Sequence, residues 1–363
     1  MDALAGLLDG PRARGAFLLR MVMEPPWAVR IEDRAPICLM SVRRGTVRVT
    51  PPGGGAPVRL GPGGIAVVRG PDPYTVGDLD GTAPHTLVGP GGTCTTLHGW
   101  PLAEDMALSV RTWGNAADGG TAVLLGTYLM AGEISRRLLD ALPPLLTVSA
   151  DARTGPLLEL LDAEIARDEP GQRVVLDRLL DLLLIAVLRA WFARPGGDAP
   201  AWYRALGDPV VGTALRLLQD DPAHPWTVAS LAARAGVSRA GLARRFTELV
   251  GEPPMSYLTA WRLAVAADLL RESDCTVEAV ARKVGYSTPF AFSSAFKRVR
   301  GVSPQEFRGG PPGDGRADAR HALGGEPGAA RDVPGREPGD ARAAGGSGPC
   351  DTRHLPEQQR SLP

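Results

Sequence analysis

Short apolar runs separated by glycine and proline dominate the first part of the chain. The runs AVRI, ICLMSV, TVRVTP, PVRLGPGGIAVV and YTVGDL fall between residues 28 and 79. Runs of this length, bounded by turn residues, are typical of β-strands. Because no long helical pattern interrupts residues 12–125, the pattern predicts an antiparallel sandwich or a small barrel.

The spacing of apolar positions changes near residue 155. Residues 156–168 and 173–193 carry apolar side chains every three or four positions, which predicts two helices. The segment RPGGDAP (residues 194–200) interrupts this pattern as a linker would, and residues 208–308 are again helical in pattern. After residue 309 almost no apolar side chain remains, which predicts a disordered tail.

Two segments of the second helical region repeat one pattern. TVASLAARAGVSRAGLARRF spans residues 227–246, and TVEAVARKVGYSTPFAFSSAF spans residues 276–296. Each begins with a threonine, Thr227 or Thr276, which is a good N-cap for a helix. Each then reaches a glycine that ends the first helix, because glycine accepts a positive φ. The turn glycines are Gly236 and Gly285.

A second helix follows the glycine in each copy. Ser238 caps this helix in the first copy, and Thr288 caps it in the second, where Pro289 then occupies the first helical position. With these caps, the distance from cap to phenylalanine is eight residues in both copies, ending at Phe246 and Phe296. A helix, a tight turn and a second helix form a helix-turn-helix, whose second helix enters the major groove of DNA.

The second helices combine an apolar stripe with cations. Leu242 with Phe246, and Phe292 with Phe296, recur at four-residue spacing and are expected to be buried. The cations on or beyond these helices can face phosphates or base edges, and they are Arg239, Arg244, Arg245, Lys297, Arg298 and Arg300. The alternative is that these are ordinary amphipathic helices with solvated arginines. Two copies at matched spacing make this alternative weaker than the helix-turn-helix interpretation.

One continuous helix is predicted between the two copies, over residues 254–273. A helix of about 19 residues is roughly 28 Å long, near the ~34 Å that separates successive major grooves on one face of DNA. Residues 208–308 contain 13 Lys and Arg against 10 Asp and Glu, a net charge of about +3. Affinity for DNA would therefore depend on the placement of these cations.

The paired motifs and the segment GYSTPFAFSSAFKRVRGVSPQEFR resemble the AraC/XylS family of bacterial transcription regulators. The family's Gly-x-Ser-Pro-x-x-Tyr-Arg ending is matched by residues 301–308, GVSPQEFR. Residues 12–31 and 58–78 also resemble the cupin-type effector domain of one AraC subgroup. The resemblance implies an α+β protein, with a cupin-like β-sandwich or barrel, then helices, then an all-α domain with two helix-turn-helix motifs joined by a long helix.

The resemblance also implies a division of the chain. Residues 1–150 would form the effector domain, 151–200 a helical dimerisation region and linker, 201–308 the DNA-binding domain, and 309–363 the tail. The apolar helix at residues 174–192 would bury one stripe on the sandwich and pair another with a partner helix, making a homodimer, and core packing within one chain is the alternative. The residues expected to serve both are Leu176, Leu179, Leu180, Leu183, Leu184, Val187 and Leu188.

The positions that read bases in this family can be transferred to the first motif. They correspond to Ala240, Ala243 and Arg244, so Arg244 is the strong candidate for a guanine contact. In the second motif the corresponding face includes Pro289, Phe290, Ser293 and Ser294. Many relatives have arginine at the position of Ser294, so phosphate contacts from the serines and Lys297 are the expected role of this helix.

No catalytic residue, metal ligand or cofactor is expected in the strand-rich part. His85 and His98 lie 13 residues apart without the His-x-His cluster of metal-binding cupins. Cys94 and His98 lie in a threonine-rich strand and are expected to be structural. Trp27, Met40 and Tyr74 lie on candidate strands or their edges and are expected to line an effector pocket.

Composition limits the remaining possibilities. The formal net charge is zero, and the four cysteines are scattered without a C-x-x-C pair, which favours a reducing compartment. No signal peptide or membrane span is evident, so a cytoplasmic protein is expected. The expected partners are promoter or operator DNA, a small-molecule effector, a second copy and, for an activator, RNA polymerase. The alternatives are a cupin-type enzyme tethered to DNA and a nonspecific architectural DNA binder.

Overall fold

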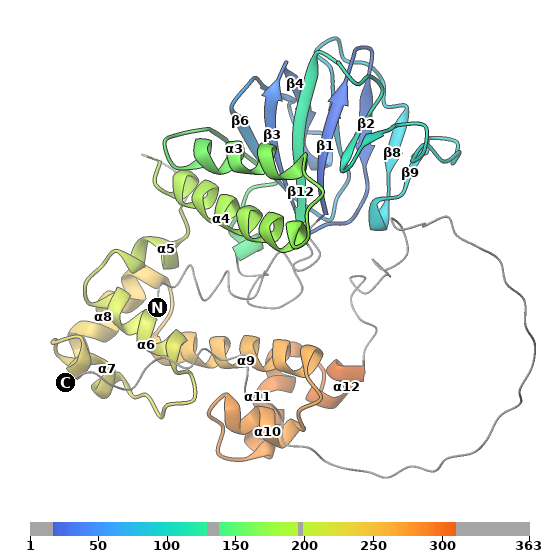
Figure 1. The fold of residues 1–363 in the computed structure, drawn as a ribbon. Coiled ribbons are helices and arrows are strands. Elements are labelled where there is room, and N and C mark those ends of the chain that lie inside the picture. The colour runs from blue at the N-terminus through green and yellow to red at the C-terminus, as the bar shows by residue number, and fades with distance from the viewer. Residues whose placement is uncertain (1–16, 129–137, 195–198, 310–363) are drawn as a thin grey trace, which may run out of the picture.

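The structure, a computed structural model, describes residues 17–128, 138–194 and 199–309. Strands come first along the chain, two helices follow them, and eight helices end the described part (Figure 1). This order agrees with the change of period in the sequence. The predicted tail lies outside the described residues except for Gly309, which is the last residue of a helix.

The strands form two sheets. The seven-stranded sheet has the order β10 (Ala107–Ser109), β11 (Thr112–Gly114), β1 (Phe17–Met23), β12 (Thr121–Tyr128), β3 (Ile37–Arg44), β6 (Gly64–Arg69) and β13 (Leu145–Ser149). The six-stranded sheet has the order β5 (Val58–Leu60), β4 (Val47–Thr50), β7 (Tyr74–Gly77), β2 (Ala28–Ile31), β8 (Thr86–Val88) and β9 (Cys94–Thr96).

Most strand pairs are antiparallel, as the sequence predicts, but two are not. Strand β1 pairs with β11 in parallel, and β2 pairs with β8 in parallel. The prediction of a purely antiparallel sandwich is therefore wrong at these two strand pairs. Each brings together strands more than 50 residues apart in the chain, a separation that short-range turn signals do not report.

The central strands are buried on both faces. In β3, Ile37 and Leu39 contribute to one apolar cluster, and Cys38 and Met40 contribute to the other. Alternate side chains of a strand point to opposite faces, so the first pair faces the helices and the second faces the other sheet. This double burial explains why ICLMSV is apolar at nearly every position.

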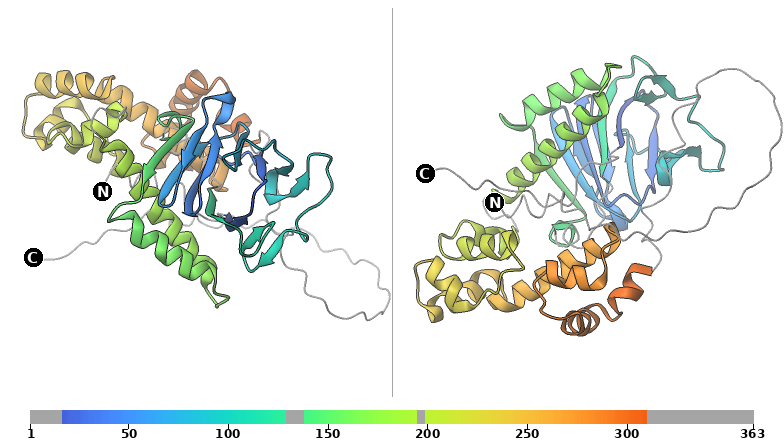
Figure 2. Two further views of the ribbon diagram at one scale, coloured as in Figure 1. Left: turned by 90° about the horizontal axis from the view of Figure 1, so that it is seen from above. Right: turned by 60° about the horizontal axis from the view of Figure 1, so that its bottom comes forward.

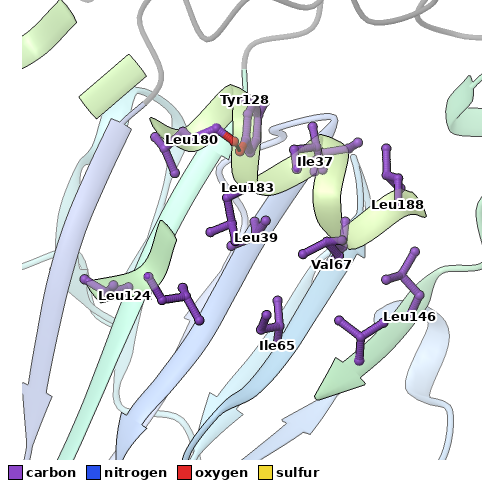
Figure 3. Close-up of a cluster of buried hydrophobic side chains, with 14 of the residues drawn as sticks. Ile37, Leu39, Ile65, Val67, Leu124, Tyr128, Leu146, Leu180, Leu183 and Leu188 are labelled. Atoms are coloured by element: carbon purple, nitrogen blue, oxygen red, sulfur yellow. Dashed lines mark hydrogen bonds between the residues drawn. The ribbon is translucent and has the colours of Figure 1, made fainter. Parts of the chain in front are cut away.

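Two helices cover the outer face of the seven-stranded sheet: α3 (Thr154–Ile165) and α4 (Gln172–Phe192) (Figures 1 and 2). In Figure 3, Leu180 and Leu183 of α4 lie over the side chains of the strands. The Tyr128 hydroxyl donates a hydrogen bond of 2.6 Å to the Leu180 carbonyl. A Cβ at Gly126 would lie 2.7 Å from Leu180, so this glycine permits the close approach of α4.

The apolar residues of α4 differ in their surroundings from the sequence expectation. Six of the seven residues expected to serve a partner as well are buried within the chain, with Leu179 partly buried: Leu176, Leu180, Leu183, Leu184, Val187 and Leu188. These side chains pack against the seven-stranded sheet and α3. The exposed apolar side chains of α4 are Val174, Val175 and Leu182, with Leu160 on α3.

The C-terminal helices form two lobes. The helices are α5 (Ala201–Leu206), α6 (Val211–Asp220), α7 (Val228–Arg234), α8 (Arg239–Val250), α9 (Pro254–Glu272), α10 (Val277–Lys283), α11 (Pro289–Arg300) and α12 (Pro304–Gly309). The long helix α9 belongs to both lobes. Tyr257 and Trp261 from its first half pack into one apolar cluster, and Leu263 and Leu270 from its second half pack into another.

An aromatic group connects the two parts of the chain. Phe192 at the end of α4 lies 4.6 Å from Tyr203 and 6.3 Å from Trp202, measured between ring centroids. Trp202 packs against the cluster beneath α4 and also against the cluster of the first C-terminal lobe. The linker expected at residues 194–200 is thus followed immediately by side chains that contact both cores.

Candidate nucleic-acid interface

The first helix-turn-helix is formed by α7 and α8. Thr227 caps α7 through a capping box with Ser230, in which each side chain accepts from the other residue's backbone N–H. Gly236 has a φ of 68° in the turn, and the Ser238 hydroxyl accepts a hydrogen bond of 3.1 Å from Gly241 N–H. The caps and the turn predicted from the sequence are therefore present here.

The second helix-turn-helix, α10 and α11, has the same construction. The Thr276 and Thr288 hydroxyls each accept a 3.1 Å hydrogen bond, from the backbone N–H of Ala279 and Ala291. Gly285 lies in the turn with a φ of 84°. Pro289 is the first residue of α11, as predicted. In both copies the residue before the second helix caps the N–H three positions later, which fixes the first turn of the helix.

The apolar stripes hold the second helices in place. Leu242 and Phe246 of α8, and Phe292 and Phe296 of α11, are 0% exposed. The phenylalanines also contact other rings, since the ring centroid of Phe246 lies 5.9 Å from that of Tyr257 and that of Phe296 lies 5.3 Å from that of Phe307. Burial of these side chains leaves the opposite faces of α8 and α11 to solvent.

The polar face of α8 places two neighbouring arginines in different environments. The Arg244 side chain is 80% exposed, and its contact with Glu248 is loose, at 3.8 Å. Arg245 instead makes two hydrogen bonds to Asp208 Oδ2, at 2.9 and 2.6 Å. Arg239 and Ala240 at the start of the helix are exposed, and Ala243 is partly buried. Of the cations on α8, Arg239 and Arg244 are the ones available to DNA.

The polar face of α11 is less charged near its start. Thr288, Pro289, Phe290 and Ser294 are exposed, and Ser293 is partly buried. Phe290 is 81% exposed, a large apolar side chain at the end of the helix expected to approach DNA. Lys297 and Arg298 are exposed in the last turn.

Two polar contacts that sequence reasoning missed fix this domain. The carboxylate of Asp208 accepts from the backbone N–H groups of Val210 and Val211 at the start of α6, besides binding Arg245. Arg262 of α9 donates to the carbonyls of Pro222 and His224, at 2.6 and 2.9 Å. The Asp-Pro pair before α6 was a signal for a cap, whereas the partners of Arg262 lie about 40 residues away in the chain.

The residues expected to line an effector pocket meet inside the sandwich. Trp27, Met40 and Tyr74 share the apolar cluster between the two sheets and are 0%, 0% and 5% exposed. Trp27 Nε1 is buried and has no hydrogen-bond partner among the described residues, and the Tyr74 hydroxyl is buried beside the Cys38 thiol. Burial raises the pKa of Tyr74 well above its usual range, so its hydroxyl keeps its proton.

Other buried groups extend this polar set. Thr86 Oγ1 and Trp113 Nε1 are likewise buried without a partner in the described part of the chain, and neither was expected from the sequence. Thr86 lies opposite Val29, whose side chain faces the interior of the sandwich. Burial raises the pKa of the Cys38 thiol to about 12 and that of Cys94 to about 11, so both thiols are protonated at neutral pH.

The described residues contain neither a cluster of metal ligands nor a membrane-spanning helix. Within residues 17–128, 138–194 and 199–309, no three His, Cys, Asp or Glu side chains gather as ligands of a metal ion would. None of the described helices is both long and apolar enough to cross a membrane.

Comparison with known proteins gives the family. Residues 2–193 match the Cupin family, and residues 231–310 match the Helix-turn-helix domain family. A Streptomyces lividans protein described as an AraC-like transcription regulator is 34% identical over 313 residues, 85% of this chain and 98% of that protein. The HTH-type transcriptional regulator AlkR of Acinetobacter baylyi is 38% identical over 177 residues, 47% of this chain and 58% of that protein.

A solved structure is also similar in sequence. The DNA-binding domain of AdpA, crystallised with a target DNA, is 35% identical and covers 28% of this chain and 92% of that domain, with a TM-score of 0.27. The family matches and the site together define a DNA-binding transcription regulator with an N-terminal cupin domain, not an enzyme. The chain belongs to the AraC family, which confirms the resemblance seen in its sequence.

Proposed function

We propose that this regulator recognises its operator with α8 and α11 placed in neighbouring major grooves, under the control of a small molecule bound by the cupin domain. The observation that carries the proposal is the shared helix α9, which is packed into the cores of both lobes. Because one helix holds both motifs, the two recognition helices have a fixed separation. In this proposal, residues 1–150 form the effector domain and residues 151–200 the helical dimerisation region and linker. Residues 201–308 form the DNA-binding domain, and residues 309–363 are the tail.

Base reading is assigned mainly to α8 and phosphate binding mainly to α11. Arg244 is exposed and only loosely paired, so its guanidinium is free to bind the O6 and N7 of a guanine. Arg239, at the first position of the helix, suits a phosphate. On α11, Ser294 and Lys297 suit phosphates, and Phe290 suits the methyl group of a thymine.

Footprinting tests this arrangement. A DNA fragment is first selected from genomic DNA by its binding to the full-length protein. Hydroxyl-radical cleavage of the complex is then measured with and without random competitor DNA. We expect two protected segments about 10 bp apart on one face of the duplex, which survive the competitor. Protection of a single segment would contradict the role of α11, and loss of protection to random DNA would indicate nonspecific binding.

The effector site is proposed between the two sheets, around Trp27, Met40 and Tyr74. The support for it is two buried donors within an otherwise apolar cluster: Trp27 Nε1, which has no partner among the described residues, and the Tyr74 hydroxyl beside the Cys38 thiol. A small apolar molecule with a hydrogen-bond acceptor fits such a set. Buried polar groups without partners are rare in native cores. The competing explanation is that these residues only pack in the core of the sandwich and bind no ligand.

A ligand screen distinguishes the two explanations. Thermal-shift hits on the full-length protein are titrated with and without operator DNA, for the wild type and for Tyr74→Phe. Coupling between two sites is usually about 1–3 kcal/mol and must be reciprocal, so DNA should change ligand affinity by the same factor as the ligand changes DNA affinity. If the ligands from the screen leave operator affinity unchanged, the cupin domain has no sensor role and is only structural.

A homodimer is proposed through the outer surfaces of α3 and α4. Val175, Leu179, Leu182 and Ala186 follow each other at intervals of four, three and four residues, the spacing of a coiled-coil seam. Val175 is 44% exposed and Leu182 is 52% exposed, although both are apolar. A second copy of the same helix would cover this stripe. If the regulator activates transcription, RNA polymerase is the further partner.

A further inference from the structure

A groove of about 650 Å³ lies on the outer face of the seven-stranded sheet, beside α3. Its lining comes from β1, β3, β10, β11, β12, α3 and the loop before β12, and includes Arg20, Arg43, Arg44, Asp118 and Asp162. Arg20 lies two residues beyond Leu18 in β1, so both side chains point to the face that the helices cover. The groove is therefore separate from the interior of the sandwich.

The charges in the groove are not balanced. Arg43 Nε donates to Asp162 Oδ2 at 2.5 Å, which satisfies one arginine with one carboxylate. Arg44 donates to the carbonyl of Gly119, which carries no net charge. Arg20 makes no ion pair with another described residue. Three guanidinium groups thus face two carboxylates, Asp118 and Asp162, and an anion in the groove is favoured.

Two polar atoms of the groove have unused hydrogen-bonding capacity. Arg20 Nε, a donor, and Asp162 Oδ1, an acceptor, are both buried without a partner in the described part of the chain. Buried polar atoms of this kind are normally paired, so each calls for a complementary group. The donor requires an oxygen, and the carboxylate oxygen requires a hydroxyl or an N–H.

We infer that this groove binds a small hydroxylated anion, such as a sugar phosphate or a hydroxy acid. The oxyanion accepts from Arg20 and lies close to the charge of Arg44, and a hydroxyl of the same molecule donates to Asp162 Oδ1. The hydrogen bond from Arg43 Nε holds the Asp162 carboxylate in position. Because Asp162 is on α3 and the arginines are on the sheet, the bound molecule joins the helical layer to the sheet.

Calorimetric titration of the full-length protein at constant ionic strength tests this inference. The probes are glucose 6-phosphate and gluconate, with inorganic phosphate and glucose as partial ligands. We expect saturable binding of at least one of the first two, weaker binding of phosphate and none of glucose. The comparison between glucose 6-phosphate and gluconate shows whether the anion is a phosphate or a carboxylate. Absence of saturable binding by both would overturn the inference, and equal binding of phosphate would overturn the role of the hydroxyl.

Variants locate the binding in the groove. Arg20→Gln should weaken binding of the tighter probe about tenfold or more, because it removes a charge-assisted contact. Arg20→Lys should recover part of the loss. Arg30→Gln, an arginine on a strand of the other sheet with a side chain 48% exposed, should leave binding unchanged. Equal affinities of wild type and Arg20→Gln, with both folded by circular dichroism, would place the anion elsewhere. This outcome is independent of operator binding.

Discussion

Arg244 and Arg245 show how neighbouring residues with the same side chain acquire different roles. Sequence reasoning predicted both to contact DNA, because both lie on the polar face of the recognition helix. The structure gives Arg245 a carboxylate partner, Asp208, from a segment 37 residues earlier. Such a partner depends on how α6 packs against α8, and helical periodicity does not report it.

The consequence for Arg244 is a loss of both affinity and specificity on substitution. Arg244→Ala should weaken operator binding by about 1–3 kcal/mol and relax the preference at one base pair, as measured by fluorescence anisotropy on single-base operator variants. Arg282→Ala is the matched control, because Arg282 has the same type of pair, 3.7 Å from Glu278, on the supporting helix α10. Equal weakening on operator and random DNA would reassign Arg244 to a phosphate.

Asp208 contributes stability that depends on pH. Burial opposes its charged form, but the hydrogen bonds from Val211 and Arg245 outweigh burial and lower its pKa from 3.8. A carboxyl with a lowered pKa stabilises the fold above its unfolded value, and this stability is lost as the pH falls through the folded value. The window of loss therefore lies below about pH 4.

Asp208→Asn should thus destabilise the protein more at pH 7 than at pH 3. We expect about 1 kcal/mol at pH 7, because Arg245 is half exposed and its charge is screened. Urea denaturation at both pH values measures the difference. Adding Arg245→Gln to this variant should cost little more at pH 7, and full additivity of the two changes would show that the pair is not coupled.

At the scale of the element, α9 and the turn at Gly285 determine how the two motifs sit relative to each other. Arg262 of α9 binds the carbonyls of the loop before α7. The same loop approaches the turn of the second motif, since a Cβ at Gly285 would lie 2.7 Å from the Ala223 carbonyl oxygen. The lobes therefore touch through backbone as well as through their shared helix.

This contact distinguishes two glycines that have similar backbone angles. Gly285→Ala combines the strain of a φ of 84° with a clash, whereas Gly301→Ala has a φ of 78° and open space. We expect Gly301→Ala to cost about 1 kcal/mol and Gly285→Ala at least about 2 kcal/mol in chemical denaturation. Equal costs would mean that the loop moves aside easily.

The helical elements were largely predictable and the strand pairings were not. The connecting helix was expected over residues 254–273 and is observed over Pro254–Glu272. Caps such as Thr276 and Ser238 act on residues three positions away, so the local sequence determines them. The neighbours of β1 come from about 90 to 110 residues later in the chain, and β8, β9, β10 and β11 are only three residues long. Runs this short carry little periodicity.

The candidate sites divide in the same way. The proposed DNA-binding faces follow from two local motifs, so the sequence alone places Arg244 and Lys297 on them. The groove formed by Arg20 and Asp162 depends on a strand and a helix more than 140 residues apart in the chain. No spacing rule connects such residues, and neither was a candidate before the fold was known.

For the whole molecule, the stripe on α4 predicts the oligomeric state. Leu182→Glu should shift a dimer to a monomer in sedimentation velocity, because a charge in an apolar seam is costly. Leu97→Glu is a control of equal exposure, as both side chains are 52% exposed. A wild-type protein that is monomeric at micromolar concentration, or a Leu182→Glu variant that stays dimeric, would contradict dimerisation through this face.

The aromatic group of Phe192, Trp202 and Tyr203 affects how the chain can be divided and how it melts. Cutting before residue 201 would leave Trp202 and Tyr203 on the DNA-binding fragment, without the apolar surface of α4 that covers them. Such a fragment would expose two large rings, whereas one starting at Leu206 would lose Trp202 and Ala205 from the core of the first C-terminal lobe. Both fragments would therefore tend to aggregate. In the intact chain, these rings are packed between the cupin domain and the DNA-binding domain. If either domain unfolds, apolar surface of the other becomes exposed. The two parts are therefore expected to unfold in one cooperative transition rather than one after the other.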